Sequence, residues 1–389
     1  MKSLPRFGEG SNFFEVVQFC TIAALSIGLN DLFLDRFSLR DHIGQGKLIY
    51  VSFFVQYGIL VLPSLLGFTI LEDKLIYIIV FLVIFVFIIR YSVTPNYSSE
   101  ALRKIPGVDY YSNYRAMLQL LTAIAILGVD FPVFPRRFAK TNKYGVSVMD
   151  TGTAAFTFAM GFGHSLFLQH KPEKNKIMKI IKQAAIMMIL GGIRPVLVQL
   201  TGHHHEVTEY GLHWNFFLTL GIVLLFSLLP GFSRIMIAVS MNVYLSTSTV
   251  FGSILNEESR NWNNFFEANK EGICSLAGYF LVYEFAYRFG EELVKKNGKC
   301  ASTNSIKFCL SACFFAFILW KFGEYSGMKP SRRIANFSYV MLSVCLNTFS
   351  ISMSMMMELF LFPRPPKLGE KTFGEKFGRS SIKAFMWKR

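Results

Sequence analysis

The residues best suited to chemistry occupy one short segment that follows an apolar run. Asp130 stands two positions before Pro132, and Lys140 follows Pro135 by five positions. Proline bends or ends a helix, so Asp130 and Lys140 are expected on the two sides of a bent turn. A carboxylate can take a proton from a hydroxyl nucleophile, and an ammonium can stabilise an oxyanion. We therefore predict that Asp130 and Lys140 are catalytic; the alternative is a turn that anchors the chain at a membrane surface.

Other charged residues in and after this turn are candidates for binding a substrate. Arg136, Arg137 and Lys143 form a basic cluster that we predict to hold phosphate groups. Asp150 and Arg194 lie inside apolar runs, where an unpaired charge is costly and marks a functional site by default. We expect these two to pair with each other or to contact a bound headgroup.

Histidine and cysteine offer a second group of candidates. Three adjacent histidines, 203–205, match no zinc-ligand spacing, and we predict no metal site. His213 stands at the start of an apolar run, where it either acts as a base or caps a helix. We predict that His213 and Asn215 contact substrate. The six cysteines are expected to pack in apolar surroundings.

The composition identifies the environment in which these residues must work. Of 389 residues, 52% are hydrophobic and 17% are charged, whereas about 25% are charged in soluble domains. The formal net charge of +15 would suggest nucleic acid in a soluble protein. Here the basic residues lie in short loops between apolar runs, as in membrane proteins. We predict a lipid bilayer, and no nucleic acid, as partner.

The apolar runs define the expected architecture. A membrane helix needs about 20 apolar residues, and we find about eleven such runs, with a range of about 10 to 13. Because the runs are continuous rather than alternating, they predict an all-α, polytopic membrane helical bundle and exclude a barrel. Residues 1–362 are expected to form a single membrane-embedded domain, and 363–389 a basic, disordered tail. The predicted runs are 13–34, 49–71, 75–91, 116–134, 146–168, 183–200, 212–230, 232–254, 271–290, 305–322 and 334–362.

Four groups of residues, in the same order along the chain, resemble the inositol acyltransferases of glycosylphosphatidylinositol (GPI) anchor synthesis, the phosphatidylinositol-glycan class W family. The strongest contains Val129-Asp130-Phe131 and Phe134-Pro135-Arg136-Arg137-Phe138-Ala139-Lys140 and extends to Asp150. The others are Glu209-Tyr210-Gly211 with His213-Trp214-Asn215-Phe216-Phe217, then Asn269-Lys270-Glu271-Gly272-Ile273, and Ser331-Arg332-Arg333 with Ala335-Asn336.

The resemblance implies a multi-pass enzyme of the endoplasmic-reticulum membrane. Such an enzyme moves a fatty acyl chain, typically palmitoyl, from acyl-CoA to an inositol hydroxyl of glucosaminyl-phosphatidylinositol. Acyl-CoA is then a co-substrate, and no cofactor is implied. The catalytic acid and lysine of the family fall on Asp130 and Lys140 of this sequence.

Two alternatives belong to other functional classes. A polytopic transporter of lipids or solutes would also bury charges, but its two halves usually echo each other, and we find no internal repeat. A non-catalytic scaffold of the same pathway is the second alternative, because the family pattern continues into further spans where this chain turns at Pro363 into its basic tail. The residues predict no particular oligomeric state.

Overall fold

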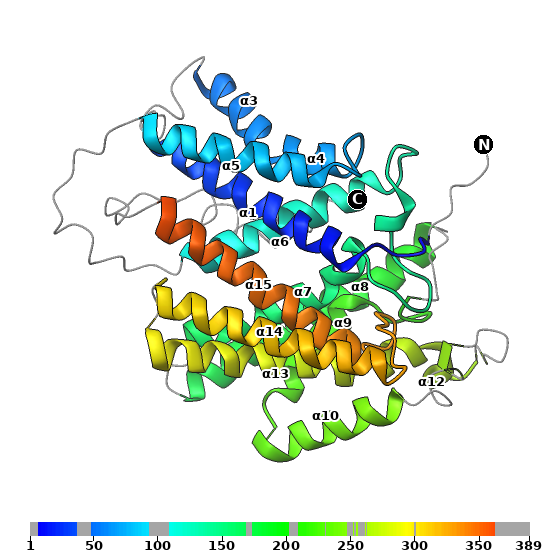
Figure 1. Cartoon of the computed structure of the whole chain (residues 1–389). Coiled ribbons are helices and arrows are strands. Elements are labelled where there is room, and N and C mark those ends of the chain that lie inside the picture. The colour runs from blue at the N-terminus through cyan, green and yellow to red at the C-terminus, as the bar shows by residue number, and fades with distance from the viewer. Residues whose placement is uncertain are drawn as a thin grey trace.

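The apolar runs form helices, because in a helix every interior backbone amide and carbonyl is satisfied within the segment. The computed structural model describes residues 7–36, 48–92, 109–168, 173–201, 209–229, 231–246, 252, 254–255, 261, 263–298 and 301–361. Within them the chain folds into a bundle of long helices, and the predicted all-α bundle is confirmed (Figure 1). The whole of the predicted tail, 363–389, lies outside the described residues, as do the histidines at 203–205.

Each predicted apolar run contains a helix or a pair of helices. The bounds are α1 Phe13–Arg36, α3 Leu48–Leu60, α4 Leu62–Gly67, α5 Leu75–Ser92, α6 Asp109–Gly128, α7 Val148–Leu168, α8 Glu173–Thr201, α9 Phe216–Phe226, α10 Gly231–Leu245, α12 Phe265–Ala268, α13 Lys270–Asn297, α14 Thr303–Tyr325 and α15 Phe337–Leu361.

One predicted run is interrupted. The stretch 49–71 forms α3 and α4, which meet at Val61. Pro63 follows in the first turn of α4, where its missing amide hydrogen costs little but its ring disturbs the preceding turn. Together the two helices still form one apolar segment, Tyr50–Gly67, that is long enough to cross a bilayer.

Several helices have the length and composition of membrane spans. Among the described residues, four segments are long and apolar enough to cross a bilayer: Phe13–Phe33, Tyr50–Gly67, Thr303–Tyr325 and Phe337–Phe360. Shorter apolar helices accompany them at Leu75–Tyr91, Phe216–Phe226 and Ile235–Leu245. The protein is therefore a multi-pass membrane protein, as its composition predicted.

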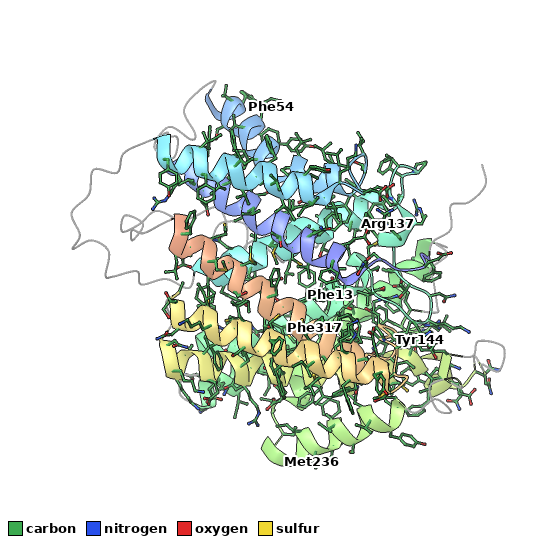
Figure 2. The ribbon with its side chains drawn as sticks, viewed as in Figure 1. Phe13, Phe54, Arg137, Tyr144, Met236 and Phe317 are labelled. Carbon is green, nitrogen blue, oxygen red and sulfur yellow. The ribbon has the colours of Figure 1, made fainter. Side chains whose placement is uncertain are left out.

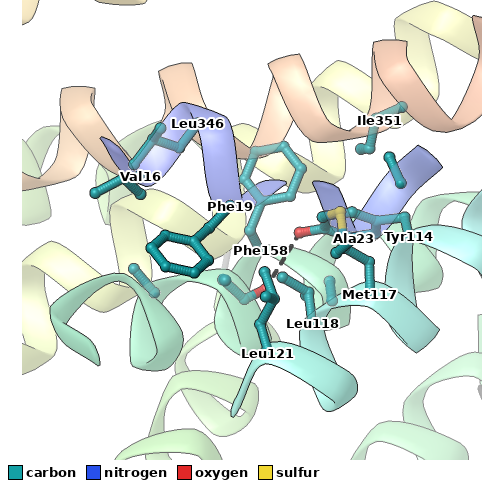
Figure 3. Packing of buried hydrophobic residues seen from close by; sticks show 14 of the residues in the cluster. Val16, Phe19, Ala23, Tyr114, Met117, Leu118, Leu121, Phe158, Leu346 and Ile351 are labelled. Atoms are coloured by element: carbon teal, nitrogen blue, oxygen red, sulfur yellow. Dashed lines mark hydrogen bonds between the residues drawn. The ribbon is translucent and has the colours of Figure 1, made fainter. Parts of the chain in front are cut away.

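The helices divide into inner and outer ones. In α1 and α15, 78% and 72% of the apolar segment is buried inside the protein. In α14 only 22% of the apolar segment is buried. Phe19 of α1, Leu121 of α6, Phe158 of α7 and Leu346 of α15 belong to one core cluster between the inner helices (Figure 3). The outer helices expose large apolar side chains such as Phe54 and Met236, which suit contact with lipid (Figure 2).

Hydroxyl groups on α15 are compatible with its burial because they bond to its own backbone. Ser343, Thr348, Ser350 and Ser354 each donate to the carbonyl four residues earlier, at 2.7 to 3.0 Å. A buried hydroxyl without such a partner would be costly in an apolar interior. The interior helix can therefore be rich in serine while remaining inside the bundle.

Candidate functional site

The candidate residues gather at one end of the bundle. Helix α6 ends there, and α1, α7, α13 and α15 begin there (Figure 1). Three acids that pair with arginines at this end lie in first turns of helices: Glu15 in α1, Asp150 in α7 and Glu271 in α13. Negative charge is stabilised at helix N-termini, which explains why these positions suit acids.

Asp130 lies in a turn whose backbone carbonyls are bound by the Arg136 side chain. Helix α6 ends at Gly128, and the prolines that follow leave its last carbonyls without helical partners. The Arg136 guanidinium donates from Nη1 to the Val129 carbonyl at 2.9 Å and from Nη2 to the Phe131 carbonyl at 2.8 Å. These carbonyls flank Asp130, whose side chain is exposed and has no hydrogen bond or ion pair among the described residues.

Arg137 is held by three acids from neighbouring segments. It lies 3.0 Å from Glu15, 3.2 Å from Glu72 and 2.6 Å from Asp73. Partial burial acts to lower the pKa of the guanidinium, but the hydrogen bond to Asp73 and the charges of Glu15 and Glu72 outweigh it and raise the pKa above its usual value. Arg137 therefore connects the turn to α1 and to the segment between α4 and α5. The predicted phosphate contact of Arg136 and Arg137 stays a prediction.

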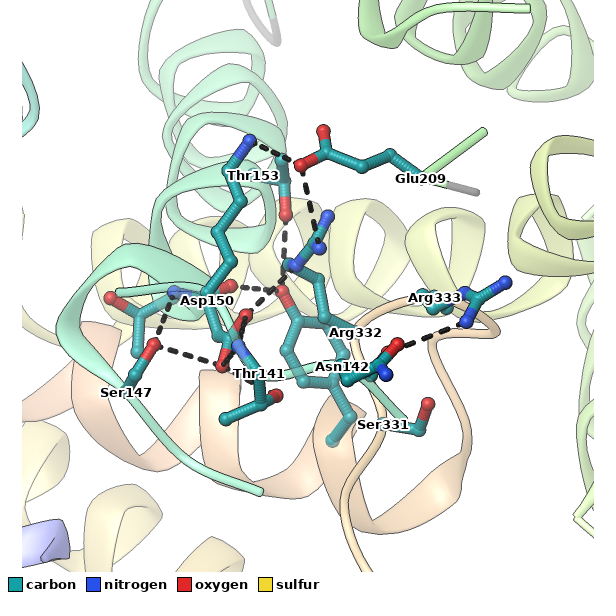
Figure 4. Close-up of polar contacts among 12 residues, drawn as sticks. Thr141, Asn142, Ser147, Asp150, Thr153, Glu209, Ser331, Arg332 and Arg333 are labelled. Atoms are coloured by element: carbon teal, nitrogen blue, oxygen red, sulfur yellow. Dashed lines mark hydrogen bonds and ion pairs between the residues drawn. The ribbon is translucent and has the colours of Figure 1, made fainter. Parts of the chain in front are cut away.

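Lys140 contacts an acid from a distant segment rather than Asp130. Its Nζ lies 2.6 Å from Oε1 of Glu209. The same Glu209 oxygen lies 3.9 Å from Nη2 of Arg332, and Nε of Arg332 lies 2.9 Å from Oδ1 of Asp150 (Figure 4). Charges of alternating sign thus connect the turn after α6, the loop before α9, the turn before α15 and the start of α7.

Asp150 is the most fully bonded member of this group. Its carboxylate accepts from the Thr141 amide at 3.2 Å, from Thr141 Oγ1 at 2.8 Å and from Ser147 Oγ at 2.9 Å, besides Arg332. Among the described side chains its ionic partner is Arg332, and the predicted pairing of Asp150 with Arg194 or with a bound headgroup stays a prediction. Arg194 itself lies within α8, and its side chain falls outside the described structure.

The turn that carries Arg332 and Arg333 is closely fitted to its surroundings. Arg333 Nη2 lies 2.9 Å from Glu271 Oε1, and both side chains are buried. Burial acts to lower the pKa of Arg332, but the charges of Glu209 and Asp150 outweigh it and raise the pKa, so Arg332 is charged at any physiological pH. The backbone of Gly278 lies directly against Ala335, which has a positive φ of 50°.

The loop before α9 places His213 and Asn215 in different roles. Asn215 caps α9: its Oδ1 accepts from the amides of Phe217 and Leu218, and its Nδ2 donates to the Gly191 carbonyl at 2.6 Å. The His213 side chain is exposed, and its amide donates to Oδ1 of Asn269 at 2.9 Å. Of the two, His213 has the side chain that is available to a ligand.

Lys143 is exposed at the same end, and the backbone around it is fixed. Ser331 Oγ donates to the Lys143 carbonyl at 2.7 Å, and the Gly145 amide donates to the Pro330 carbonyl at 3.0 Å. The Lys143 ammonium has no ion pair among the described residues. In the described ranges, no three His, Cys, Asp or Glu side chains are grouped so that they could hold a metal ion.

Sequence reasoning gave no role to Glu209, Glu271, Arg332 or Arg333, although each lies within a quoted motif. The sequence did contain a signal for them: two acids and two adjacent arginines stand at the ends of apolar runs, and buried charges require partners. The sequence did not show which acid pairs with which arginine. A pairing within one helix is easier to predict, because residues four apart share a helix face: Glu284 and Arg288 of α13 pair at 2.7 Å.

The fold and the site define a polytopic helical membrane protein with an ionic network beneath a proline-bent turn at one end. A family model named GWT1 matches residues 6–385. The GPI-anchored wall transfer protein 1 of Candida albicans is 32% identical over 383 residues, which cover 84% of this chain and 77% of that protein. The phosphatidylinositol-glycan biosynthesis class W protein of Dictyostelium discoideum is 29% identical over 409 residues, which cover 90% of this chain and 82% of that protein.

A third relative shows a shorter match. The GPI-anchored wall transfer protein 1 of Saccharomyces cerevisiae is 31% identical over 278 residues, which cover 61% of this chain and 56% of that protein. Because the family model matches nearly the whole sequence, the chain belongs to the GWT1 family. The assignment to the inositol acyltransferases of GPI-anchor synthesis, made from the motifs, is thereby confirmed.

Proposed function

We propose that the protein transfers a fatty acyl chain from acyl-CoA to an inositol hydroxyl of glucosaminyl-phosphatidylinositol in the endoplasmic-reticulum membrane. The observation that carries the proposal is the turn after α6, within the region that matches the GWT1 model. There Arg136 clamps the carbonyls on both sides of Asp130, and the Asp130 carboxylate is left free of protein partners among the described residues. A carboxylate available to a hydroxyl is what a general base requires.

In the proposed reaction the inositol hydroxyl attacks the thioester carbonyl of acyl-CoA. Asp130 takes the hydroxyl proton as the new C–O bond forms, and Lys140 stabilises the negative charge on the carbonyl oxygen. The C–S bond then breaks, and the proton passes from Asp130 to the departing thiolate. No acyl-enzyme is required, because the acceptor attacks the donor directly.

The surrounding basic residues suit an acceptor that carries phosphate. Lys143 is exposed, and its ammonium has no ionic partner in the described part of the chain, so it is the member of the basic cluster with most freedom to meet a phosphate. His213 lies in the loop that also carries Glu209, the partner of Lys140, and its exposed ring suits a contact with the sugar headgroup. We propose that Arg136 and Arg137 act mainly by shaping the turn.

The test measures acylated glucosaminyl-phosphatidylinositol in microsomes that express variants. Asp130→Asn should lower the rate about 10²- to 10⁴-fold, the range typical for loss of a general base. Because Asp130 is exposed, the variant should reach the same abundance as the unchanged protein. Glu324→Gln is the matched control: it removes a partly exposed carboxylate that pairs with Lys321 on α14, and it should leave the rate unchanged.

Two results would contradict the proposal. Full activity of Asp130→Asn would show that the carboxylate is not the base. Loss of all activity in His213→Ala, together with retained activity in Asp130→Asn, would point to histidine-based acyl transfer. His213→Ala is instead expected to raise the KM for the lipid acceptor.

A further inference from the structure

Lys140 is part of a closed ring of contacts. Its ammonium contacts Glu209 at 2.6 Å, and Glu209 lies 3.9 Å from Arg332. Arg332 contacts Asp150 at 2.9 Å, and Asp150 accepts from the amide of Thr141, the residue that follows Lys140. The ring therefore begins at the side chain of Lys140 and returns to its own backbone.

The two halves of the ring differ in burial. Arg332 and Asp150 are only 3% and 2% exposed, so they form a rigid base that fixes the backbone beside Lys140. Lys140 and Glu209 are 34% and 19% exposed, so their contact lies at the open edge of the ring. An ion pair this accessible to solvent contributes little to stability. Its short distance therefore points to control of where the ammonium lies rather than to holding the fold together.

Glu209 has the position that such control requires. It lies in the loop before α9, which is anchored independently: Leu212 donates to the Ala268 carbonyl at 3.1 Å, and the Gly272 amide donates to the Tyr210 carbonyl at 3.0 Å. A lysine side chain has several rotatable bonds and does not define a direction by itself. A carboxylate on an anchored loop fixes the direction in which the lysine ammonium points.

We propose that Glu209 is the positioning residue for Lys140. Its carboxylate holds the ammonium, and its own place is set by the buried pair Arg332–Asp150, so that the charge on Lys140 is aimed before substrate arrives. Preorganised charge of this kind stabilises an oxyanion without reorganisation during the reaction. The inference rests on the proposed role of Lys140. It adds Glu209, a residue that has no part in the proposed reaction as described above.

The experiment compares kinetics of purified full-length variants in detergent or in vesicles. Glu209→Gln keeps the shape but removes the charge, and it should lower kcat at least tenfold with little change in KM for the lipid acceptor and in melting temperature. Glu209→Asp keeps the charge but shortens the reach, so it should retain more kcat than Glu209→Gln. Glu284→Gln is the control: it breaks the 2.7 Å pair with Arg288 on α13, away from the site, and should leave kcat unchanged.

A double substitution tests whether Glu209 acts through Lys140. In a Lys140→Arg background, whose residual activity is measurable, Glu209→Gln should have a much smaller effect than it has in the unchanged protein, because coupled residues are not additive. Equal effects in both backgrounds would overturn the inference. So would a raised KM with unchanged kcat, which would make Glu209 a binding residue.

The outcomes separate this inference from the proposed function. If Lys140→Ala is inactive while Glu209→Gln is fully active, the positioning role is wrong and the proposed function stands. If Lys140→Ala is fully active, the proposed role of Lys140 is wrong as well. If Glu209→Gln yields too little folded protein, Glu209→Asp carries the test, and its unchanged kcat would overturn the inference.

Discussion

The Nε atom of Arg332 lies 2.9 Å from Oδ1 of Asp150, and the two side chains are 3% and 2% exposed. The pair connects the turn before α15 with the first turn of α7, although 182 positions separate the two residues. It forms the base on which the turn with Lys140 lies, because Asp150 also binds the amide and hydroxyl of Thr141. The position of the candidate site therefore depends on a contact between the two halves of the sequence.

Breaking this pair from one side should destabilise the protein strongly. Asp150→Ala leaves the Arg332 charge buried without its partner, and loss of one member of a buried pair costs about 3–5 kcal/mol. We expect a clear fall in melting temperature of the purified protein, followed by tryptophan fluorescence or by aggregation on heating. The double variant Asp150→Ala with Arg332→Met should recover part of the loss. A melting temperature of Asp150→Ala equal to that of the unchanged protein would contradict the assigned role of the pair.

The second prediction concerns the clamp that Arg136 places around Asp130. Arg136→Lys keeps the positive charge but cannot bridge the carbonyls of Val129 and Phe131, because an ammonium lacks the planar fork of a guanidinium. If Arg136 acts by shaping the turn, the variant should lose about tenfold or more in kcat, since small misplacements of a catalytic group are costly. The measurement is the rate of acyl transfer at saturating substrate.

The control for this prediction is Arg288→Lys, which makes the same replacement on α13, where the half-exposed Arg288 pairs with Glu284. It should leave the rate unchanged. If Arg136 instead served as a charge for phosphate, Arg136→Lys would retain kcat and change mainly the KM for the lipid acceptor. That result would favour the phosphate contact predicted from the sequence over the turn-shaping role.

The third prediction uses the close approach of α13 to the turn before α15. A Cβ atom at Gly278 would lie 1.8 Å from the carbonyl oxygen of Ala335, so Gly278→Ala must displace that turn. Overpacking of this kind costs about 1–3 kcal/mol. Because the turn carries Arg332 and Arg333, the variant should lose activity as well as thermal stability.

Gly192→Ala is the matched comparison for Gly278→Ala. Gly192 lies within α8, and a Cβ atom there would meet nothing within 4 Å. Alanine is favoured over glycine in a helix interior by about 1 kcal/mol, so this variant should be as stable as the unchanged protein or slightly more so. A similar loss in both variants would show that the contact with Ala335 is not the cause.

Much of the fold could be predicted from the sequence, because helix formation in this chain depends on local properties. The length and continuity of each apolar run, together with Pro132 and Pro135, were enough to place the helices and the bent turn that follows α6. The motifs around Asp130, Glu209 and Arg332 were enough to identify the family. Several helix bounds differed from the predicted runs: α6 begins at Asp109 instead of residue 116, and α8 begins at Glu173 instead of residue 183. The run 49–71 is also broken at Val61, since a proline in the first turn of a helix can end one helix or begin the next.

The ionic partners that join distant segments, in contrast, were decided only by the tertiary structure. Arg136 and Arg137 are adjacent, yet one binds backbone carbonyls and the other binds three acids from other segments. Asp150 pairs with Arg332, and Lys140 pairs with Glu209, each across a long distance in the sequence. The physical reason is that helix formation depends on the apolar residues within one segment. A buried charge, in contrast, pairs with whichever opposite charge the packed helix ends bring within about 4 Å.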